Sequence, residues 1–169
     1  MPTTTNNGWT VPSSTDLVRD GATAIATLGN NIDNTIGAWK TTWTPAVQGT
    51  GWAKGNGVTI GRYKQIADVV FFELQFTTGS TTTYGTGGLS FDLPVTNDGT
   101  MDQWVQGAFF DNSANLYYDI TAKISGGNVI PYVQASGGTV TNSLNTLTSA
   151  RPVTVAVSDV VQISGSYRV

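Results

Sequence analysis

The chain contains no cysteine and no histidine, and Glu73 is its only glutamate. Without cysteine it forms no disulfide bond and offers no thiolate to zinc or to a nucleophilic mechanism. Without histidine it lacks the commonest general base and metal ligand. A glycosidase needs two carboxylates about 5–10 Å apart, and several aspartates of this chain stand in segments typical of turns. We therefore expect no catalytic residues, no metal site and no cofactor.

Charge is also scarce. Lys, Arg, Asp and Glu make up 11% of the chain, against about 25% in an average globular protein. The net charge is −3, which argues against a nucleic-acid partner because such proteins carry a basic stripe. No apolar run approaches the ~20 residues of a membrane helix, so we expect no membrane insertion. The first residues also lack the basic and apolar segments of a secretory signal.

Threonine and glycine are abundant instead, with 27 and 20 copies. Threonine is β-branched and favours strands. From residue 57 onward, β-prone segments alternate with turn signals every ~8–12 residues, and no βαβ pattern occurs. The expected fold is mainly β, with an antiparallel β-sandwich or jelly-roll-like head over residues 57–169. The segments that carry this pattern include "VTIGRYKQIA", "DVVFFELQFTT", "WVQGAFFD", "LYYDITAKI", "NVIPYVQA" and "VVQISGSYRV".

One segment, "DLVRDGATAIATLGNNID" at residues 16–33, has a helical pattern. Pro12 ends an extended stretch, and Ser13 or Ser14 is a suitable N-cap, so we expect a helix over residues 13–36. Its apolar stripe consists of Val18, Ile25, Leu28 and Ile32. The stripe is thin and interrupted by glycine, and a lone helix of this composition is unstable in water. We expect this helix to form a bundle with copies of itself.

Two segments flank the helix. Residues 1–12 form a polar arm whose one large anchor is Trp9, and we expect this arm to serve attachment. Residues 37–56 combine tryptophan with glycine and proline. There we expect a hinge at Gly37, followed by a first strand near residues 43–48.

The aromatic residues of the β region are candidates for ligand binding, because an exposed ring stacks on the C–H face of a sugar. Tyr84 lies in a Thr/Gly loop, and Trp104 begins an expected strand. In "LYYDI", alternation places Tyr117 and Tyr118 on opposite faces, so only one is exposed. We take Tyr118 as the ligand candidate of this pair. The alternative for all of these rings is a place in the core.

The segment "DNSAN" adds two polar candidates, Asp111 and Asn115. Its oxygen ligands are close in sequence, as in a calcium-binding loop, but it lacks the acidic density of such loops. The alternative is that these residues form a turn. The sequence leaves both interpretations open.

Several segments resemble a known family. "TDLVRDGATAIATLGNNID" resembles a stretch near the start of phage minor tail proteins and tail fibres, especially from phages that infect actinobacteria. "TTWTPAVQGTG" and "GNGVTIGRYKQIADVVFFELQFTTGSTTTYGTGGLSFDLP" resemble the β module that ends many such proteins. The final "DVVQISGSYRV" resembles the closing strand of that module, with Ser166 where threonine is usual. The similarity covers most of residues 9–95 and 159–169.

The resemblance implies a homotrimeric tail fibre or spike subunit, located on the virion and extracellular after release. Its N-terminal arm would join other tail or capsid proteins. Its β head, above all residues 100–150, would bind host cell-surface polysaccharide. The alternative is a structural virion component without a receptor, such as a capsid-decorating fibre or a tail assembly protein. A third hypothesis, a small glycan depolymerase, conflicts with the absence of histidine and the single glutamate.

Overall fold

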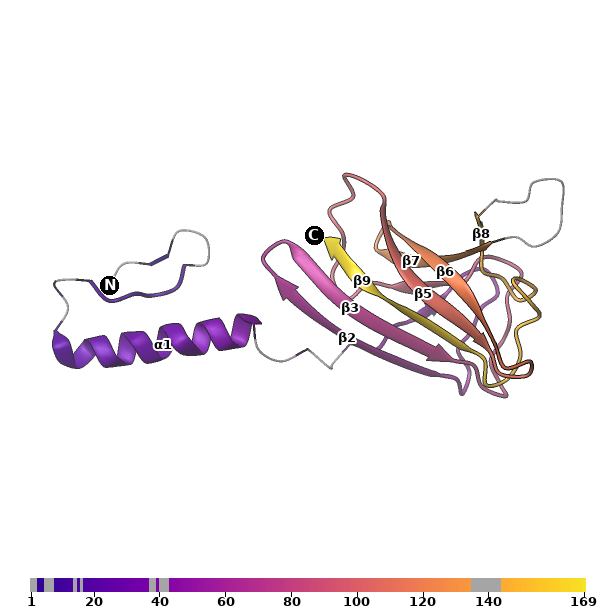
Figure 1. The fold of residues 1–169 in the computed structure, drawn as a ribbon, viewed down its shortest axis with the longest axis horizontal. Helices are drawn as coiled ribbons and strands as arrows, with labels where there is room; N and C mark the ends of the chain where they lie inside the picture. Colours follow the sequence, from indigo (N-terminus) through magenta and orange to yellow (C-terminus); the bar gives the residue numbers. More distant parts are fainter. Residues whose placement is uncertain are drawn as a thin grey trace. The chain divides into compact units, whose positions relative to one another are not determined.

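The computed structural model describes residues 3–4, 8–13, 15, 17–36, 39, 43–134 and 144–169. The chain divides into two compact units, residues 1–39 and residues 40–169, and we describe each by itself (Figure 1). Among the described residues, the first unit contains one helix and the second contains antiparallel strands. The expected fold class, mainly β with a short N-terminal helix, is therefore confirmed.

The helix of the first unit, α1, spans Val18–Ile36. The backbone oxygen of Leu17 accepts hydrogen bonds from the N–H groups of Asp20 (2.9 Å) and Gly21 (3.2 Å). These are the first bonds of the helical turn, and Asp20 places a negative charge near the positive end of the helix dipole. The helix therefore begins at residue 18.

The structure corrects the expected helix start at residue 13. The hydroxyl oxygens of Ser13 and Thr15 lie 3.1 Å apart, within hydrogen-bond distance of each other. Ser13 stands five residues before Val18, too far to cap the helix, since an N-cap residue precedes the first helical residue directly. Ser14, the other expected N-cap, lies outside the described residues.

The arm before the helix folds back on itself. Thr3 and Thr10 form an antiparallel bridge, and the N–H of Thr4 donates to the carbonyl oxygen of Trp9 at 2.8 Å. Gly8 turns the chain with a φ of +64°, a conformation that glycine adopts without strain. Trp9, the expected attachment anchor, is half-buried.

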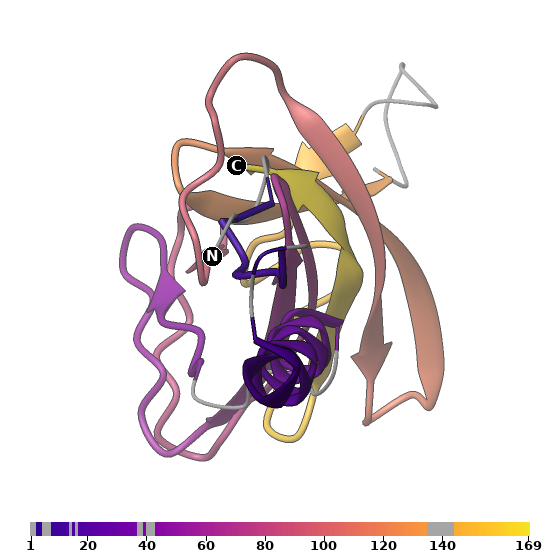
Figure 2. The same cartoon turned by 90° about the vertical axis from the view of Figure 1, so that its left-hand side faces the viewer.

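The described part of the second unit contains nine strands in one sheet. Their bounds are β1 Val47–Gln48, β2 Val58–Ile66, β3 Val69–Thr77, β4 Ser90–Asp92, β5 Gln103–Asp111, β6 Leu116–Ser125, β7 Asn128–Gln134, β8 Leu144–Thr146 and β9 Val160–Arg168. The strand order is β1-β4-β7-β6-β5-β9-β3-β2, with β8 also paired to β7, and all pairs are antiparallel. The sheet twists and curls into a nearly closed, barrel- or sandwich-like fold (Figure 2).

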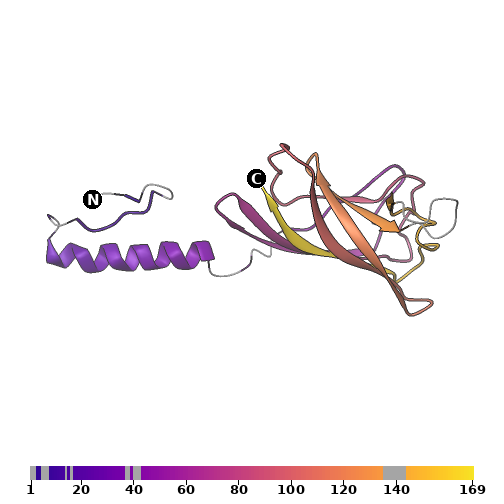
Figure 3. The same cartoon turned by 45° about the horizontal axis from the view of Figure 1, so that its top comes forward.

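The last strand of the sequence lies in the middle of the sheet. β9 pairs with β3 on one side and with β5 on the other, and Figure 3 shows β9, β5 and β6 running side by side. Val161 stands opposite Phe76 of β3 and opposite Phe109 of β5. These three buried side chains share the inner face of the sheet. β9 therefore joins two parts of the core that are distant in sequence.

Alternation along the strands separates core from surface. On β3, every second residue is buried, and the buried residues are Val70, Phe72, Leu74 and Phe76. The rings of Phe72 and Tyr167 meet edge to face with centroids 5.6 Å apart. Full burial of one such side chain contributes about 1.5–3 kcal/mol, so the inner face supplies most of the stability of this unit.

Residues 43–56 are the described part of the expected joining segment 37–56, and they belong to the compact unit of the head. Trp43 is buried and packs edge to face against Phe72, with centroids 6.1 Å apart. A Cβ atom at Gly61 would lie 2.5 Å from the Trp43 ring, so glycine at this position of β2 leaves the space that the ring occupies. The expected first strand is shortened to β1. Gly37, the expected hinge residue, lies outside the described residues.

Asp159 connects three loops at one end of the sheet. It is 1% exposed, and its carboxylate accepts hydrogen bonds from the N–H groups of Asn112 (3.0 Å) and Ala156 (2.7 Å). Its backbone oxygen accepts from the N–H of Thr78 at 3.0 Å. A buried carboxylate that accepts two backbone hydrogen bonds stabilises the fold. Without this side chain, the two N–H groups would lose their acceptor.

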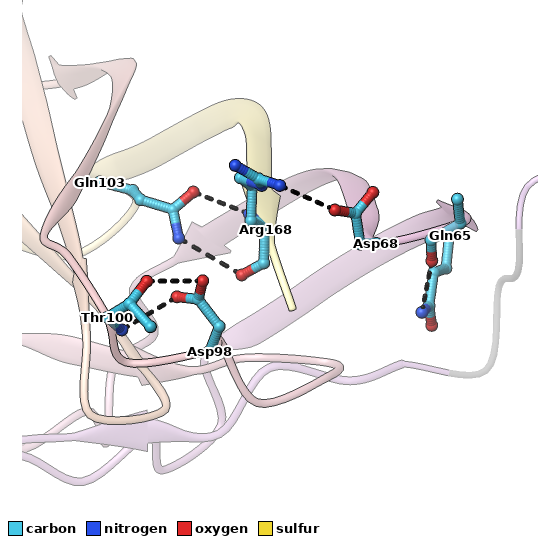
Figure 4. A network of polar contacts seen from close by, with 7 residues as sticks. Gln65, Asp68, Asp98, Thr100, Gln103 and Arg168 are labelled. Atoms are coloured by element: carbon cyan, nitrogen blue, oxygen red, sulfur yellow. Dashed lines mark hydrogen bonds and ion pairs between the residues drawn. The ribbon is translucent and has the colours of Figure 1, made fainter.

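Polar contacts also secure the end of β9 (Figure 4). The side-chain amide of Gln103 accepts from the N–H of Arg168 at 2.7 Å and donates to its carbonyl oxygen at 3.3 Å. The guanidinium of Arg168 donates to Asp68 at 3.0 Å, and this hydrogen bond lowers the pKa of the Asp68 carboxyl. Asp98 bonds to the backbone N–H and the hydroxyl of Thr100, as a turn-forming aspartate does.

We predict that Asp159→Ala lowers the free energy of unfolding by about 3 kcal/mol, because it removes two charge-assisted hydrogen bonds from partly buried backbone N–H groups to this buried carboxylate. Urea unfolding at neutral pH measures this effect. Asp119→Ala is the control, since it removes the same charge from an exposed position of β6. Equal unfolding midpoints for Asp159→Ala and the wild type would contradict the prediction.

The Asp68–Arg168 pair predicts a dependence of stability on pH. Since the pKa of Asp68 is lowered in the folded state, the pair stabilises the fold above the unfolded pKa of about 3.9. This contribution disappears as the pH falls through the folded pKa. The unfolding midpoint of the wild type should therefore fall more between about pH 5 and about pH 3 than that of Asp68→Asn. Asp119→Asn should behave as the wild type, and identical slopes for all three proteins would refute the role of the pair.

Candidate functional site

Asp111 and Asn115 form the turn between β5 and β6. The Asp111 carboxylate accepts hydrogen bonds from the N–H (2.9 Å) and the hydroxyl (2.7 Å) of Ser113 and from the N–H of Ala114 (3.1 Å). The hydroxyl of Ser113 is the main cause of the lowered pKa of Asp111. Asn115 is exposed with a φ of +56°, in the left-handed region that asparagine tolerates. Of the two interpretations left open, the structure supports the turn.

Tyr84 has an apolar neighbour that is distant in sequence. Its ring meets Trp52 edge to face with centroids 6.1 Å apart, and the side chain packs against the core. The Tyr84 hydroxyl is shielded from solvent and has no hydrogen-bond partner in the described part of the chain. The structure therefore places the Tyr84 ring against the edge of the core, where it is partly buried.

The choice between the two tyrosines of β6 is corrected. Tyr118 faces inward and packs against Phe109, with ring centroids 6.1 Å apart. Tyr117 is the exposed residue, at 70%. The sequence contains a signal for this outcome, because Tyr118 alternates in step with the apolar side chains at positions 120 and 124 of the same strand.

Trp104 is half exposed on the outer face of β5. Its ring lies against Tyr132 of β7, with centroids 5.6 Å apart. Lys123, opposite Trp104 in the strand register, forms a 2.8 Å ion pair with Asp102. Trp104 is thus the one expected ligand aromatic that the structure places with its ring on the surface.

A second aromatic pair lies on the outer face of the sheet, and the sequence did not single it out. Phe110 of β5 and Tyr117 of β6 stand opposite each other in the register. Their ring centroids are 4.7 Å apart with 32° between the planes, close to an offset stack. The pair offers a flat, exposed aromatic surface at one end of β5.

A groove lies on the same outer face, across β2, β3, β9 and β5. Its volume is about 560 Å³. The residues that line it are Ile60, Arg62, Glu73, Leu74, Gln75, Gly107, Ala108, Gln162, Ile163 and Ser164. Ala108 and Gly107 form the β5 side of the groove, where the small side chains leave room above the backbone. Larger residues here would fill the hollow.

Side-chain amides run along the floor of the groove. The Nε2 of Gln162 donates to the Oε1 of Gln75 at 2.9 Å, and the Nε2 of Gln75 lies 3.3 Å from the hydroxyl oxygen of Thr77. Arg62 and Glu73 form an ion pair on the β2 side, with a 2.6 Å bond from Nε to the carboxylate. These bonds orient the amides and cancel the charge of the two ionised groups.

The helix of the first unit has two different faces. Ala24 is buried and Leu28 is half-buried. The neighbouring stripe stays exposed, and its isoleucines are Ile25 (63%), Ile32 (38%) and Ile36 (58%). The side chain of Val18, which the sequence assigns to this stripe, lies outside the described part. Leu28, three residues after Ile25 and four before Ile32, lies beside this stripe on the helix and is covered more than its neighbours.

A metal site and a membrane-spanning helix each have requirements that can be compared with the described residues. No group of three or more acidic side chains gathers there in a way that could hold a metal ion. The helix in that part is not long and apolar enough to cross a membrane.

The outer face of the sheet has a mixed polar and aromatic character. It combines amides, hydroxyl groups and two ion pairs, Arg62–Glu73 and Lys123–Asp102, with two exposed aromatic pairs. Such a surface suits a ligand with many hydroxyl groups and apolar C–H faces. A scan against protein-family models and searches of curated proteins and of solved structures found no match for this chain.

Proposed function

We propose that this chain is a subunit of a phage tail fibre or spike and attaches the virion to polysaccharide on the host cell surface. The observation that carries the proposal is the outer face of the head, where a neutral, amide-lined groove adjoins exposed aromatic rings. The resemblance of the N-terminal helix and the β module to phage tail proteins supports the same function. The chain works outside the cell after virion release, without catalysis.

The composition of the outer face favours polysaccharide over other ligands. A nucleic acid requires several cations along its path. Among the described residues that line the groove, Arg62 is the one cation, and it is paired with Glu73. A protein partner is bound chiefly through a buried apolar or aromatic centre, whereas amides form the middle of this groove. Sugars match both the amides and the nearby rings.

We propose further that α1 assembles three copies of the chain. The isoleucine stripe is exposed in the described part of the chain, and each isoleucine contributes about 1.5–3 kcal/mol when it is covered. Three helices with such a stripe cover each other's apolar faces, as in a short coiled coil. The arm that contains Trp9 lies next to this helix in sequence, and we assign to it the contact with other virion proteins.

We predict that the wild-type chain sediments as a trimer and that Ile25→Asp with Ile32→Asp produces monomers, because two charges would be buried in each helix. Analytical ultracentrifugation measures the mass directly. Thr27→Asp with Asn34→Asp is the matched control: it places the same charges at the same spacing on the opposite, exposed face. A trimer in the Ile25/Ile32 variant, or a monomer in the wild type, would refute assembly through this stripe.

We predict that Fab fragments against the outer face of the head block adsorption of virions that carry this chain to host cells. Immunogold labelling with the same Fab locates the chain on the tail or on the capsid. Fab fragments against the arm serve as the control. If the virion binds Fab on the head and still adsorbs at the wild-type rate, the chain is a structural component of the virion, and the attachment function is refuted.

A further inference from the structure

We infer that the groove and the Phe110–Tyr117 pair form one continuous site for a neutral, extended oligosaccharide that lies across the strands of the sheet. The inference rests on the proposed attachment function and specifies its ligand and its site. It assigns the stacking role to Tyr117 and Phe110, and it assigns hydrogen bonding to Gln75 and Gln162.

The strand register makes the two features adjacent. Ala108, on the β5 side of the groove, stands opposite Gln162, and Gln162 stands opposite Gln75. Phe110 is the next outward-facing residue of β5 after Ala108, about 7 Å further along the strand. An extended ligand therefore passes from the ring pair into the groove without a change of face.

The dimensions fit a short oligosaccharide. From β5 across β9 and β3 to β2 there are three strand spacings of about 4.8 Å, or roughly 14 Å, the length of about three sugar rings. Tyr117 on β6 extends this path by one further strand. The Arg62–Glu73 pair marks the other end of the path, on β2 and β3.

The two glutamines retain hydrogen-bonding capacity for a ligand. An amide has two N–H donors and one oxygen acceptor. The bonds from Gln162 to Gln75 and from Gln75 to Thr77 use one N–H of each amide. In the described part of the chain this leaves one N–H on each glutamine and the carbonyl oxygen of Gln162. A donor next to an acceptor matches two adjacent sugar hydroxyl groups, each of which both donates and accepts.

The aromatic pair supplies the apolar half of the recognition. Tyr117 is 70% exposed, and its ring packs against that of Phe110 with centroids 4.7 Å apart. The supported ring is held in one orientation, so stacking on the C–H face of a sugar costs little conformational entropy. The exposed ring and the oriented amides together fit a pyranose better than a purely polar or purely apolar molecule.

The charges around the path favour a neutral ligand over a polyanion. Arg62 is neutralised by Glu73, and Asp119 stands opposite Ala108 in the register with a further negative charge. A charged polysaccharide would meet this carboxylate without a free cation to offset it among the groove residues. We therefore assign the site to neutral sugars and expect its affinity to change little with ionic strength.

The test uses the labelled full chain on an array of neutral and anionic microbial oligosaccharides, followed by titration of one bound neutral probe. Gln162→Ala and Tyr117→Ala should each weaken binding about tenfold, the loss of one good hydrogen bond or one stacked ring. Gln65→Ala is the control for the amide, because it is exposed on β2 and bonds to the backbone of Ala67. Trp104→Ala tests the competing aromatic pair, because Trp104 carries the other exposed ring on the same face of β5.

Each outcome decides a different point. Weakened binding in Gln162→Ala and in Tyr117→Ala supports the site, provided that Gln65→Ala binds as the wild type and the unfolding midpoints of all variants are unchanged. Binding to neutral probes that is lost in Trp104→Ala and kept in Tyr117→Ala overturns the site and leaves the attachment function standing. Binding only to anionic probes overturns the ligand class. If the wild-type chain binds no probe, the attachment function fails together with the site.

Discussion

The pairing of β9 between β3 and β5 is the interaction on which both faces of the head depend. On the inner face it joins Val161 to Phe76 and Phe109, which closes the core. On the outer face the same strand brings Gln162 beside Gln75, which forms the floor of the groove. Because strand side chains alternate, core packing and groove geometry follow from one register. A shift of one residue would expose the core and bury the amides.

This dependence explains why the groove contains small residues. A Cβ atom at Gly107 would lie 2.3 Å from the carbonyl oxygen of Gln162, so glycine permits the close approach of β5 to β9. Ala108 follows it on the outer face and leaves the space above the sheet open. Thr78 and Asp159 hold the start of β9 against the end of β3 through a 3.0 Å backbone bond. The groove is therefore supported by buried contacts between the strands.

The fold class could be predicted from the sequence because it depends on local patterns: alternation, turn signals and one amphipathic segment. The buried position of Trp43 could not be predicted. Its partner Phe72 lies about 30 residues away, and the contact is recognisable only once β2 and β3 pair. The inward position of Tyr118 was accessible from the parity of its own strand. The groove could not be predicted from the sequence. Gln75 and Gln162 meet only because β3 and β9 are neighbours in the sheet, and patterns within a single sequence do not encode this strand order.

The scarcity of charge connects the two proposals. A shallow neutral groove gains little from electrostatic attraction, so a single head should bind a short glycan with a Kd on the order of 1 mM. Attachment of a virion needs far tighter binding. Three heads held by the exposed isoleucine stripe of α1 would convert later contacts into intramolecular ones and raise the overall affinity by about 10²–10⁴-fold. The helix that assembles the proposed trimer is therefore as necessary to attachment as the groove, although it touches no ligand.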